Sequence, residues 1–248
     1  MSEIIDEVRR LKTSARSESE RGQYEAAARN LRGAIKALEE ALARAEGGGG
    51  GATLSSAPSD AEEARLAMEL ADLYGMLGGA SRKQGDLMRA AAAYDHGFRY
   101  ESDPRYGFVN TYNTLNRLVT RILMRPDSLS DPDVLRGVGE LEFVDVPAAL
   151  TELRQELERE VAGVRVNDFW AAGDLAFTCA LNGDEQGALR AVRGFASCSP
   201  PPPTSAYAAY AGWIGAVAEL DTPRKEVLRK VKQSFEDGMD VAPGGVQA

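Results

Sequence analysis

The chain has 248 residues, 44% of them apolar, and its 38 acidic and 29 basic side chains give a net charge of −9. A chain of this length can bury a substantial core, and its negative charge opposes binding to the phosphate backbone of nucleic acids. Two cysteines are too few for a disulfide framework and lack zinc-ligand spacing. The first residues, MSEIIDEVRR, carry acids where a secretory signal carries bases, and no stretch has the roughly 20 apolar residues of a membrane span. We therefore expect a cytoplasmic protein with neither a nucleic-acid nor a membrane partner.

Apolar residues recur every three or four positions along most of the chain, which is the spacing of amphipathic helices. In chain order, the pattern predicts helices at residues 2–20, 23–45, 59–82, 85–100, 106–124, 147–163, 168–181, 184–197, 204–220 and 222–238. The best strand candidate is the short segment LEFVDV at 141–146. The Gly- and Ser-rich stretch at 47–59 predicts a flexible loop, and the four prolines at 200–203 predict a short extended connector.

Three pairs of consecutive helices repeat one packing device. A glycine turn is followed five residues later by an alanine, and four residues after that by a large apolar residue on the same helix face. The three sets are Gly22, Ala27 and Leu31; Gly85, Ala90 and Tyr94; and Gly183, Ala188 and Val192. Alanine lets two helix backbones approach closely, so we expect Ala27, Ala90 and Ala188 to be buried.

The segment at residues 71–104 resembles the consensus of the tetratricopeptide repeat (TPR), a unit of two antiparallel helices, at nearly every packing position. The resemblance implies an all-α fold that forms an irregular TPR-like α-solenoid of antiparallel helix pairs, because the glycine turns are not separated by multiples of the TPR unit. An ordinary bundle of Ala-rich helices with glycine turns is the alternative. The regions we expect are an N-terminal TPR-like helix pair at 1–46, the flexible loop at 47–59, a TPR-like helical array at 60–238 and a disordered tail at 239–248.

Residues 94–196 resemble the central TPR region of the apoptosis signal-regulating kinases and its bacterial relatives. In that family a helix carrying an asparagine follows an acidic-proline-aromatic turn, and a later helix opens with a tryptophan and ends in a Gly-Asp turn. The matching residues are Asn110 and Asn113 for the first feature, and Trp170, Gly183 and Asp184 for the second. The resemblance implies an interaction or regulatory module of a signalling or defence system, although the sequence contains no kinase segment.

Side chains that would support catalysis are sparse. His96 is the only histidine, and nothing near it in the sequence supplies a catalytic triad or a metal-ligand spacing. The glycine run at 47–51 lacks the Lys-Ser/Thr ending of a phosphate-binding loop. Cys179 and Cys198 are expected to be buried apolar residues rather than reactive thiols. We therefore predict a chain that is not an enzyme and that has no catalytic residue, no cofactor and no metal site.

The helix expected at 106–124 carries the most prominent polar row, whose members recur at spacings of three and four and therefore share one face. In TPR grooves, asparagine and basic side chains clamp the backbone or the terminal carboxylate of a peptide. In the alternative, the asparagines bridge neighbouring helices and Arg117 forms a surface ion pair. The predicted partner-binding residues are Asn110, Asn113, Arg117 and Arg121, flanked by Tyr106 and Tyr112.

A second row, formed by Tyr207, Tyr210 and Trp213, lies on the helix expected at 204–220. At helical spacing such a row is typical of a core, and an exposed surface for a partner or for self-association is the alternative. Trp170 is likewise expected in the core.

Together, these patterns predict a non-enzymatic adaptor or scaffold that holds a peptide or helix of another protein on the concave face of a TPR-like array. A small-molecule-sensing helical regulator of a partner effector is one alternative, and an enzyme with an acidic site that lacks histidine is another. Assembly into a homo-oligomer also stays open.

Overall fold

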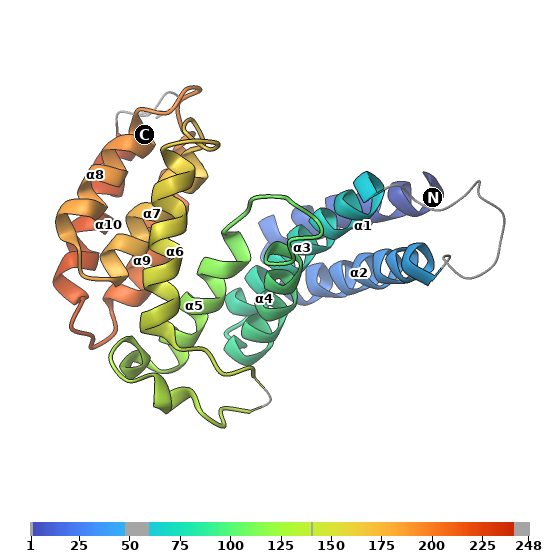
Figure 1. Ribbon diagram of the computed structural model, residues 1–248, viewed down its shortest axis with the longest axis horizontal. Coiled ribbons are helices and arrows are strands. Elements are labelled where there is room, and N and C mark those ends of the chain that lie inside the picture. Colours follow the sequence, from blue (N-terminus) through green and yellow to red (C-terminus); the bar gives the residue numbers. More distant parts are fainter. Residues whose placement is uncertain (1, 48–59, 140, 241–248) are drawn as a thin grey trace. The chain divides into compact units, whose positions relative to one another are not determined.

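The computed structural model describes residues 2–47, 60–139 and 141–240. In these ranges the chain forms ten α-helices and two short 3-10 helices and contains no strand, which confirms the predicted all-α fold. The elements are α1 (Ser2–Glu20), α2 (Tyr24–Gly47), α3 (Asp60–Lys83), α4 (Leu87–Glu101), α5 (Tyr112–Met124), η1 (Pro126–Leu129), η2 (Pro132–Leu135), α6 (Val146–Val161), α7 (Phe169–Leu181), α8 (Glu185–Ala196), α9 (Thr204–Ala218) and α10 (Lys225–Met239) (Figure 1). None of these helices is both long enough and apolar enough to span a membrane.

The chain divides into two compact units, Met1–Thr120 and Arg121–Ala248, with the boundary inside α5. The predicted division into four regions stays a prediction, because most of the loop expected at 47–59 and of the tail expected at 239–248 lies outside the described residues. We therefore describe each compact unit by itself.

Two local expectations differ from the structure, and turn geometry explains both. The helix expected from residue 106 begins only at Tyr112, because Gly107 has a φ of +61° and Asn110 accepts a hydrogen bond from the Tyr112 amide (3.1 Å). The strand candidate at 141–146 forms no strand. Its Asp145 carboxylate instead caps α6 by accepting a hydrogen bond from the Ala148 amide (3.0 Å). The other helices begin and end within three residues of the predicted positions.

In the first unit, α1 to α4 pack in chain order, each against the next, so that α1 and α3 both lie on α2. Gly22 (φ +74°) and Gly85 (φ +81°) make the turns within the α1–α2 and α3–α4 pairs, in a left-handed conformation that favours glycine. Ala27 and Ala90 are fully buried, as predicted. The core residues between the helices include Val8, Leu31, Leu38, Leu66, Leu70 and Leu73.

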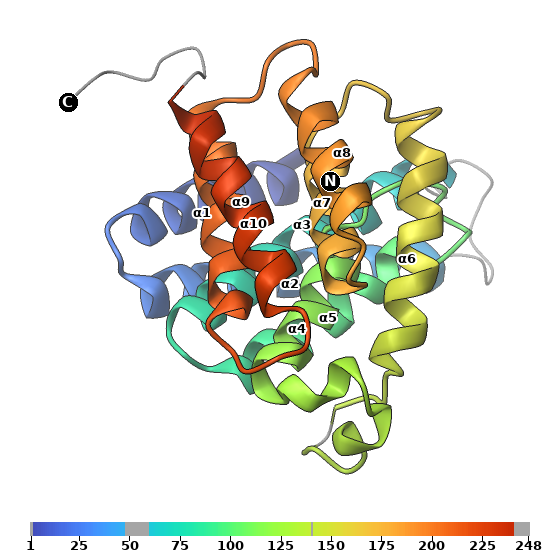
Figure 2. The same ribbon diagram turned by 90° about the vertical axis from the view of Figure 1, so that its left-hand side faces the viewer.

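In the second unit, α6, α7 and α8 pack in chain order, and α10 packs against α7, α8 and α9 (Figure 2). Gly183 (φ +81°) makes the turn between α7 and α8, and Ala188 is fully buried, as predicted. The core of this unit is aromatic, with rings from α8, α9 and α10 meeting edge to face. Its central ring, Phe195, has centroid distances of 4.7, 5.7 and 5.1 Å to Tyr207, Tyr210 and Phe235.

Candidate partner-binding site

The polar row on α5 begins with side chains that contact the helices of the first unit. Asn113 is fully buried, and its side-chain amide donates hydrogen bonds to the carbonyl of Ala71 in α3 (2.9 Å) and to the carboxylate of Glu101 in α4 (2.8 Å). Gly97 in α4 leaves the space for this amide, since a Cβ at position 97 would collide with it. Asn113 therefore bridges two helices, as in the alternative interpretation.

The two arginines of the row are also used within the chain. Arg117 Nε donates to Asp95 Oδ1 in α4 (2.7 Å), and both side chains are less than a tenth exposed. The Arg117 guanidinium also lies 4.2 Å from the ring centroid of Phe98. Arg121 belongs to the second unit, is 1% exposed and donates to the carbonyl of Glu142 (3.0 Å). The expected ion pair of Arg117 is thus buried rather than on the surface, and Asn113, Arg117 and Arg121 of the predicted face are all buried.

The flanking residues of the row complete this interior packing. Tyr106 is 9% exposed and its ring lies 6.3 Å from that of Tyr100. The Tyr112 ring contacts Tyr94 edge to face at 6.3 Å, and Asn110 holds the turn before α5. We therefore place the candidate binding site elsewhere in the unit.

The aromatic row on α9 belongs to the core of the second unit. Tyr207 and Tyr210 are buried, and the Tyr210 hydroxyl donates to the Asp174 carboxylate (2.7 Å). Trp213 is partly buried, with its ring 6.0 Å from that of Tyr210. The core interpretation of this row fits these contacts. The core position expected for Trp170 is wrong, because this residue lies in the first turn of α7 and is 46% exposed.

Glu101, the last residue of α4, caps the first turn of α5. Its carboxylate accepts hydrogen bonds from the backbone amides of Asn113 and Thr114 (both 3.1 Å) and from their side chains (2.8 and 3.2 Å). Burial raises the pKa of Glu101 to about 7, although the four donors oppose this shift.

This raised pKa makes stability depend on pH in a defined direction. The folded state holds the Glu101 proton more tightly than the unfolded chain, so the stabilising contribution is full below about pH 4.5 and is lost as the pH rises through about 7. Between about pH 4.5 and 8, we expect the free energy of unfolding to fall by up to about 3 kcal/mol relative to Glu101→Gln, which cannot titrate. Urea denaturation at both pH values measures this difference. If the free energies of unfolding of the natural protein and of Glu101→Gln change with pH in parallel, the prediction is wrong, because Glu101 then has the same pKa in the folded and the unfolded chain.

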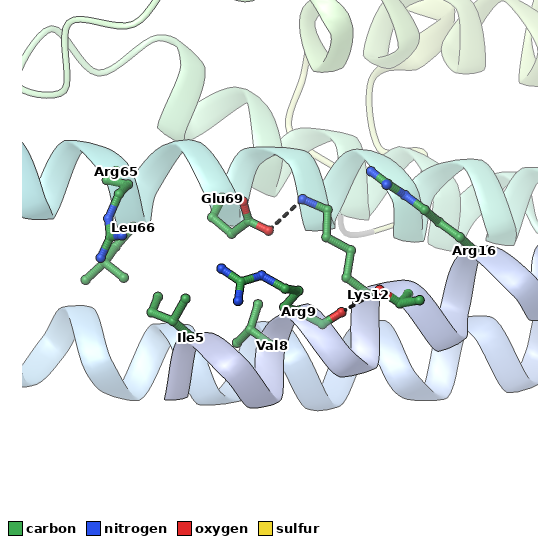
Figure 3. A pocket seen from close by; sticks show the side chains of 9 residues that line it. Ile5, Val8, Arg9, Lys12, Arg16, Arg65, Leu66 and Glu69 are labelled. Carbon is green, nitrogen blue, oxygen red and sulfur yellow. Dashed lines mark hydrogen bonds and ion pairs between the residues drawn. The ribbon is translucent and has the colours of Figure 1, made fainter. Parts of the chain in front are cut away.

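A groove between α1 and α3 is the best candidate for a partner-binding site (Figure 3). It encloses a volume of about 330 Å³. From α1 it is lined by residues at helical spacing that share one face, and from α3 by residues one turn apart. The lining residues are Ile5, Val8, Arg9, Lys12, Thr13 and Arg16 of α1, and Arg65, Leu66 and Glu69 of α3.

The groove combines an apolar floor with a cationic rim. Val8 and Leu66 are buried, and Ile5 is partly buried beside them. The rim carries four cationic side chains, and the lining contains a single acid, Glu69. Figure 3 shows the side chains of Arg9 and Arg65 extending into the space between the two helices. Three acids outside the lining, Asp6, Glu62 and Asp72, pair with Arg9, Arg65 and Lys12, so the rim carries charges of both signs.

The four cations are held with different strength. Lys12 Nζ contacts Glu69 (2.6 Å) and Asp72 (2.5 Å), and its side chain is 16% exposed. Burial alone would lower the pKa of Lys12, but the bonds to Asp72 and Glu69 outweigh it and raise this pKa. Within the described residues, Arg9 and Arg65 pair only with neighbouring acids of their own helices, in exposed contacts that stabilise weakly.

Arg16 is the cationic side chain of the groove that can bind an incoming anion without first breaking an ion pair within the described residues. Its side chain is exposed, and within the described part of the chain it forms neither an ion pair nor a side-chain hydrogen bond. An incoming anion can therefore approach Arg16 without displacing an acid of the protein itself.

A second groove, of about 310 Å³, lies along α6, α7 and α8. Its lining includes Cys179 and Cys198, together with small residues of α8. Burial raises the pKa of Cys179 to about 11 and also raises that of Cys198, so both thiols are protonated at neutral pH. These cysteines fit the expected role of buried apolar residues, and the groove has no comparable gathering of charge.

The one histidine of the sequence packs against an aromatic ring. His96 stacks on the ring of Tyr74 at 5.1 Å, and the Tyr74 hydroxyl donates to Glu39 (2.5 Å). Across the ranges that the structure describes, no three His, Cys, Asp or Glu residues are grouped to hold a metal ion.

Comparison with known proteins assigns no family to the chain. No family model matches it, and neither a curated protein nor a solved structure matches it significantly. The described residues define an all-helical protein, and the groove between α1 and α3 is its best candidate site.

Proposed function

We propose that this chain is a TPR-like interaction scaffold whose groove between α1 and α3 binds a segment of a partner protein. One observation carries the proposal: three exposed arginines, Arg9, Arg16 and Arg65, line a single groove on a chain whose net charge is −9. Exposed guanidinium groups can pair with carboxylates of a partner, and such charge complementarity selects the partner and speeds association.

The helix arrangement supports the TPR-like part of the proposal. Helices α1 to α4 pack in chain order, and α1 and α3 lie on the same helix, α2, as the first helices of two successive units do in a solenoid. The buried alanines after the turn glycines provide the close approach that this packing needs. We place the scaffold in the cytoplasm, in a signalling or defence system, and expect it to act without catalysis.

A small-molecule-sensing regulator is the second candidate, because a volume of about 330 Å³ is also at the lower end of the size of ligand pockets. A ligand that binds only the folded state raises the melting temperature. Thermal shifts with anionic metabolites, compared between the natural protein and Arg9→Glu/Arg65→Glu, distinguish the two candidates.

Site-specific photo-crosslinking in the native host tests the scaffold proposal. A crosslinking residue at Thr13, which lines the groove, should form an adduct with a partner protein, whereas one at Gln233, an exposed residue of α10, should not. The Thr13 adduct should disappear in Arg9→Glu/Arg65→Glu, whose circular dichroism spectrum should match that of the natural protein because both arginines are exposed. An adduct that survives the double charge reversal would contradict the proposal.

A further inference from the structure

The connector between α8 and α9 contains four consecutive prolines, Pro200 to Pro203, at the ends of these two helices (Figure 2). Each proline ring fixes φ at about −65°, and a residue that precedes a proline favours ψ values of about +120° to +160°. Pro203, the last of the four, has a φ of −71° and a ψ of 155°. The three peptide bonds that join the prolines are trans. The connector therefore adopts the polyproline II conformation.

Three of the four prolines are exposed, and the fourth anchors the connector. Pro202 is buried, whereas Pro200, Pro201 and Pro203 are exposed. Polyproline II has three residues per turn, so Pro200 and Pro203 lie on one face, Pro201 lies on the second and Pro202 lies on the third. Contact through Pro202 thus fixes the connector on its own unit and leaves its other two faces exposed.

The exposed part of the connector also has backbone carbonyls to offer. The Pro203 carbonyl accepts a hydrogen bond from the Ala206 amide (2.9 Å) in the first turn of α9. The carbonyls of Pro200 and Pro201 accept no hydrogen bond from the described residues. A carbonyl without a partner inside the chain is left to water or to a donor of another molecule. The connector therefore presents ring surface and hydrogen-bond acceptors together.

The residues around the prolines favour recognition by aromatic rings rather than by charge. The sequence has no charged residue between Arg193 and Glu219. Domains that bind polyproline II segments pack aromatic side chains against the prolines, and the hydroxyl of tyrosine or the indole N–H of tryptophan can donate to a backbone carbonyl. The connector is already held in this conformation, so it loses little conformational entropy on binding.

We propose that the proline connector is a docking element for a partner domain whose groove is lined by aromatic side chains. This element belongs to the second unit, whereas the groove between α1 and α3 belongs to the first, so neither site requires the other. A scaffold with one binding element on each unit can hold two partners at once.

Photo-crosslinking at Ser199 in a lysate of the native host tests this docking element, with a synthetic decaproline peptide as the competitor. Ser199 is exposed and directly precedes the first proline. A crosslinking residue at this position should form an adduct with a partner protein. Decaproline should remove the adduct, whereas a Gly-Ser peptide of the same length should not. Added salt should change the adduct little, because salt screens charge pairs and not ring contacts.

Two double substitutions assign the adduct to the exposed proline rings. Pro200→Ala/Pro203→Ala removes both rings of one exposed face and should reduce the adduct about tenfold, as expected for two lost ring contacts. The matched control, Pro104→Ala/Pro223→Ala, replaces two exposed prolines that each stand alone and should leave the adduct unchanged. Proline restrains the unfolded chain, so both variants should lose a similar, small amount of stability, and thermal melting checks that both are folded.

An adduct that decaproline removes, and that persists in Arg9→Glu/Arg65→Glu, supports the docking element. Failure to form an adduct, an adduct that decaproline leaves in place, or equal adducts in the two double proline variants would overturn it, because the prolines then serve only as a connector. An adduct whose mass is that of two copies of this chain would overturn it as well. Each of these results leaves the Thr13 crosslinking test of the α1–α3 groove unaffected.

Discussion

Replacing Asp95 with alanine should lower the free energy of unfolding by about 3–5 kcal/mol, because it leaves the Arg117 guanidinium buried without its carboxylate. In the folded chain, Arg117 Nε lies 2.7 Å from Asp95 Oδ1, and the two side chains are 9% and 6% exposed. Removing one partner of a buried ion pair costs far more than the pair itself contributes, since the remaining charge cannot recover its hydration. Urea denaturation followed by circular dichroism measures the loss.

An exposed pair of the same chemistry provides the control. Asp133 and Arg136 form an ion pair in which both side chains are about two thirds exposed, so Asp133→Ala should cost less than about 1 kcal/mol. Adding Arg117→Met to Asp95→Ala should restore part of the stability, because it removes the stranded charge while keeping an apolar stem. A loss in Asp95→Ala no greater than that in Asp133→Ala would contradict the interior placement of the α5 polar row.

Replacing Phe195 with alanine should destabilise the second unit by about 3–5 kcal/mol. Phe195 is fully buried, and its ring meets those of Tyr207, Tyr210 and Phe235 edge to face within 5.7 Å. Its removal leaves a cavity at the place where α8, α9 and α10 meet, and the rigid neighbouring rings fill such a cavity poorly.

The same substitution at Phe143 is the matched control, because this ring is 40% exposed and is covered on one side by the Arg136 guanidinium (4.2 Å). Phe143→Ala should cost about 1 kcal/mol or less. Chemical denaturation of both variants gives the comparison. Equal losses at the two positions would show that Phe195 is not the centre of this core.

Helical periodicity predicted the helices well, because apolar residues at helical spacing mark the buried face of each amphipathic helix. It did not predict what packs against that face. Asn113 and Arg117 share a face of α5, as their spacing requires, but whether that face meets solvent depends on α3 and α4. The residue that makes burial possible lies on another helix: Gly97 in α4 leaves room for the Asn113 amide, and this contact appears only once the two helices pack together.

The groove between α1 and α3 could not be predicted for the same reason, because it forms between two helices. Its α1 residues were visible in the sequence, since Arg9, Lys12 and Arg16 recur at spacings of three and four. Arg65 and Glu69 face them only because α1 and α3 both pack on α2, which is a tertiary relation that periodicity within one helix does not contain. Spacing within one helix therefore identifies the polar row on α5, but it cannot identify a groove between two helices.

The most direct test of the proposed partner site is to titrate the isotopically labelled protein with the partner segment captured by crosslinking at Thr13 and to follow the backbone amide resonances by NMR. A partner segment in the groove should shift amides of residues 5–16 in α1 and 65–72 in α3, while the amides of α7 and α8 beside the second groove stay in place. Shifts centred on α7 and α8, or shifts in α1 and α3 that persist unchanged in Arg9→Glu/Arg65→Glu, would contradict the account.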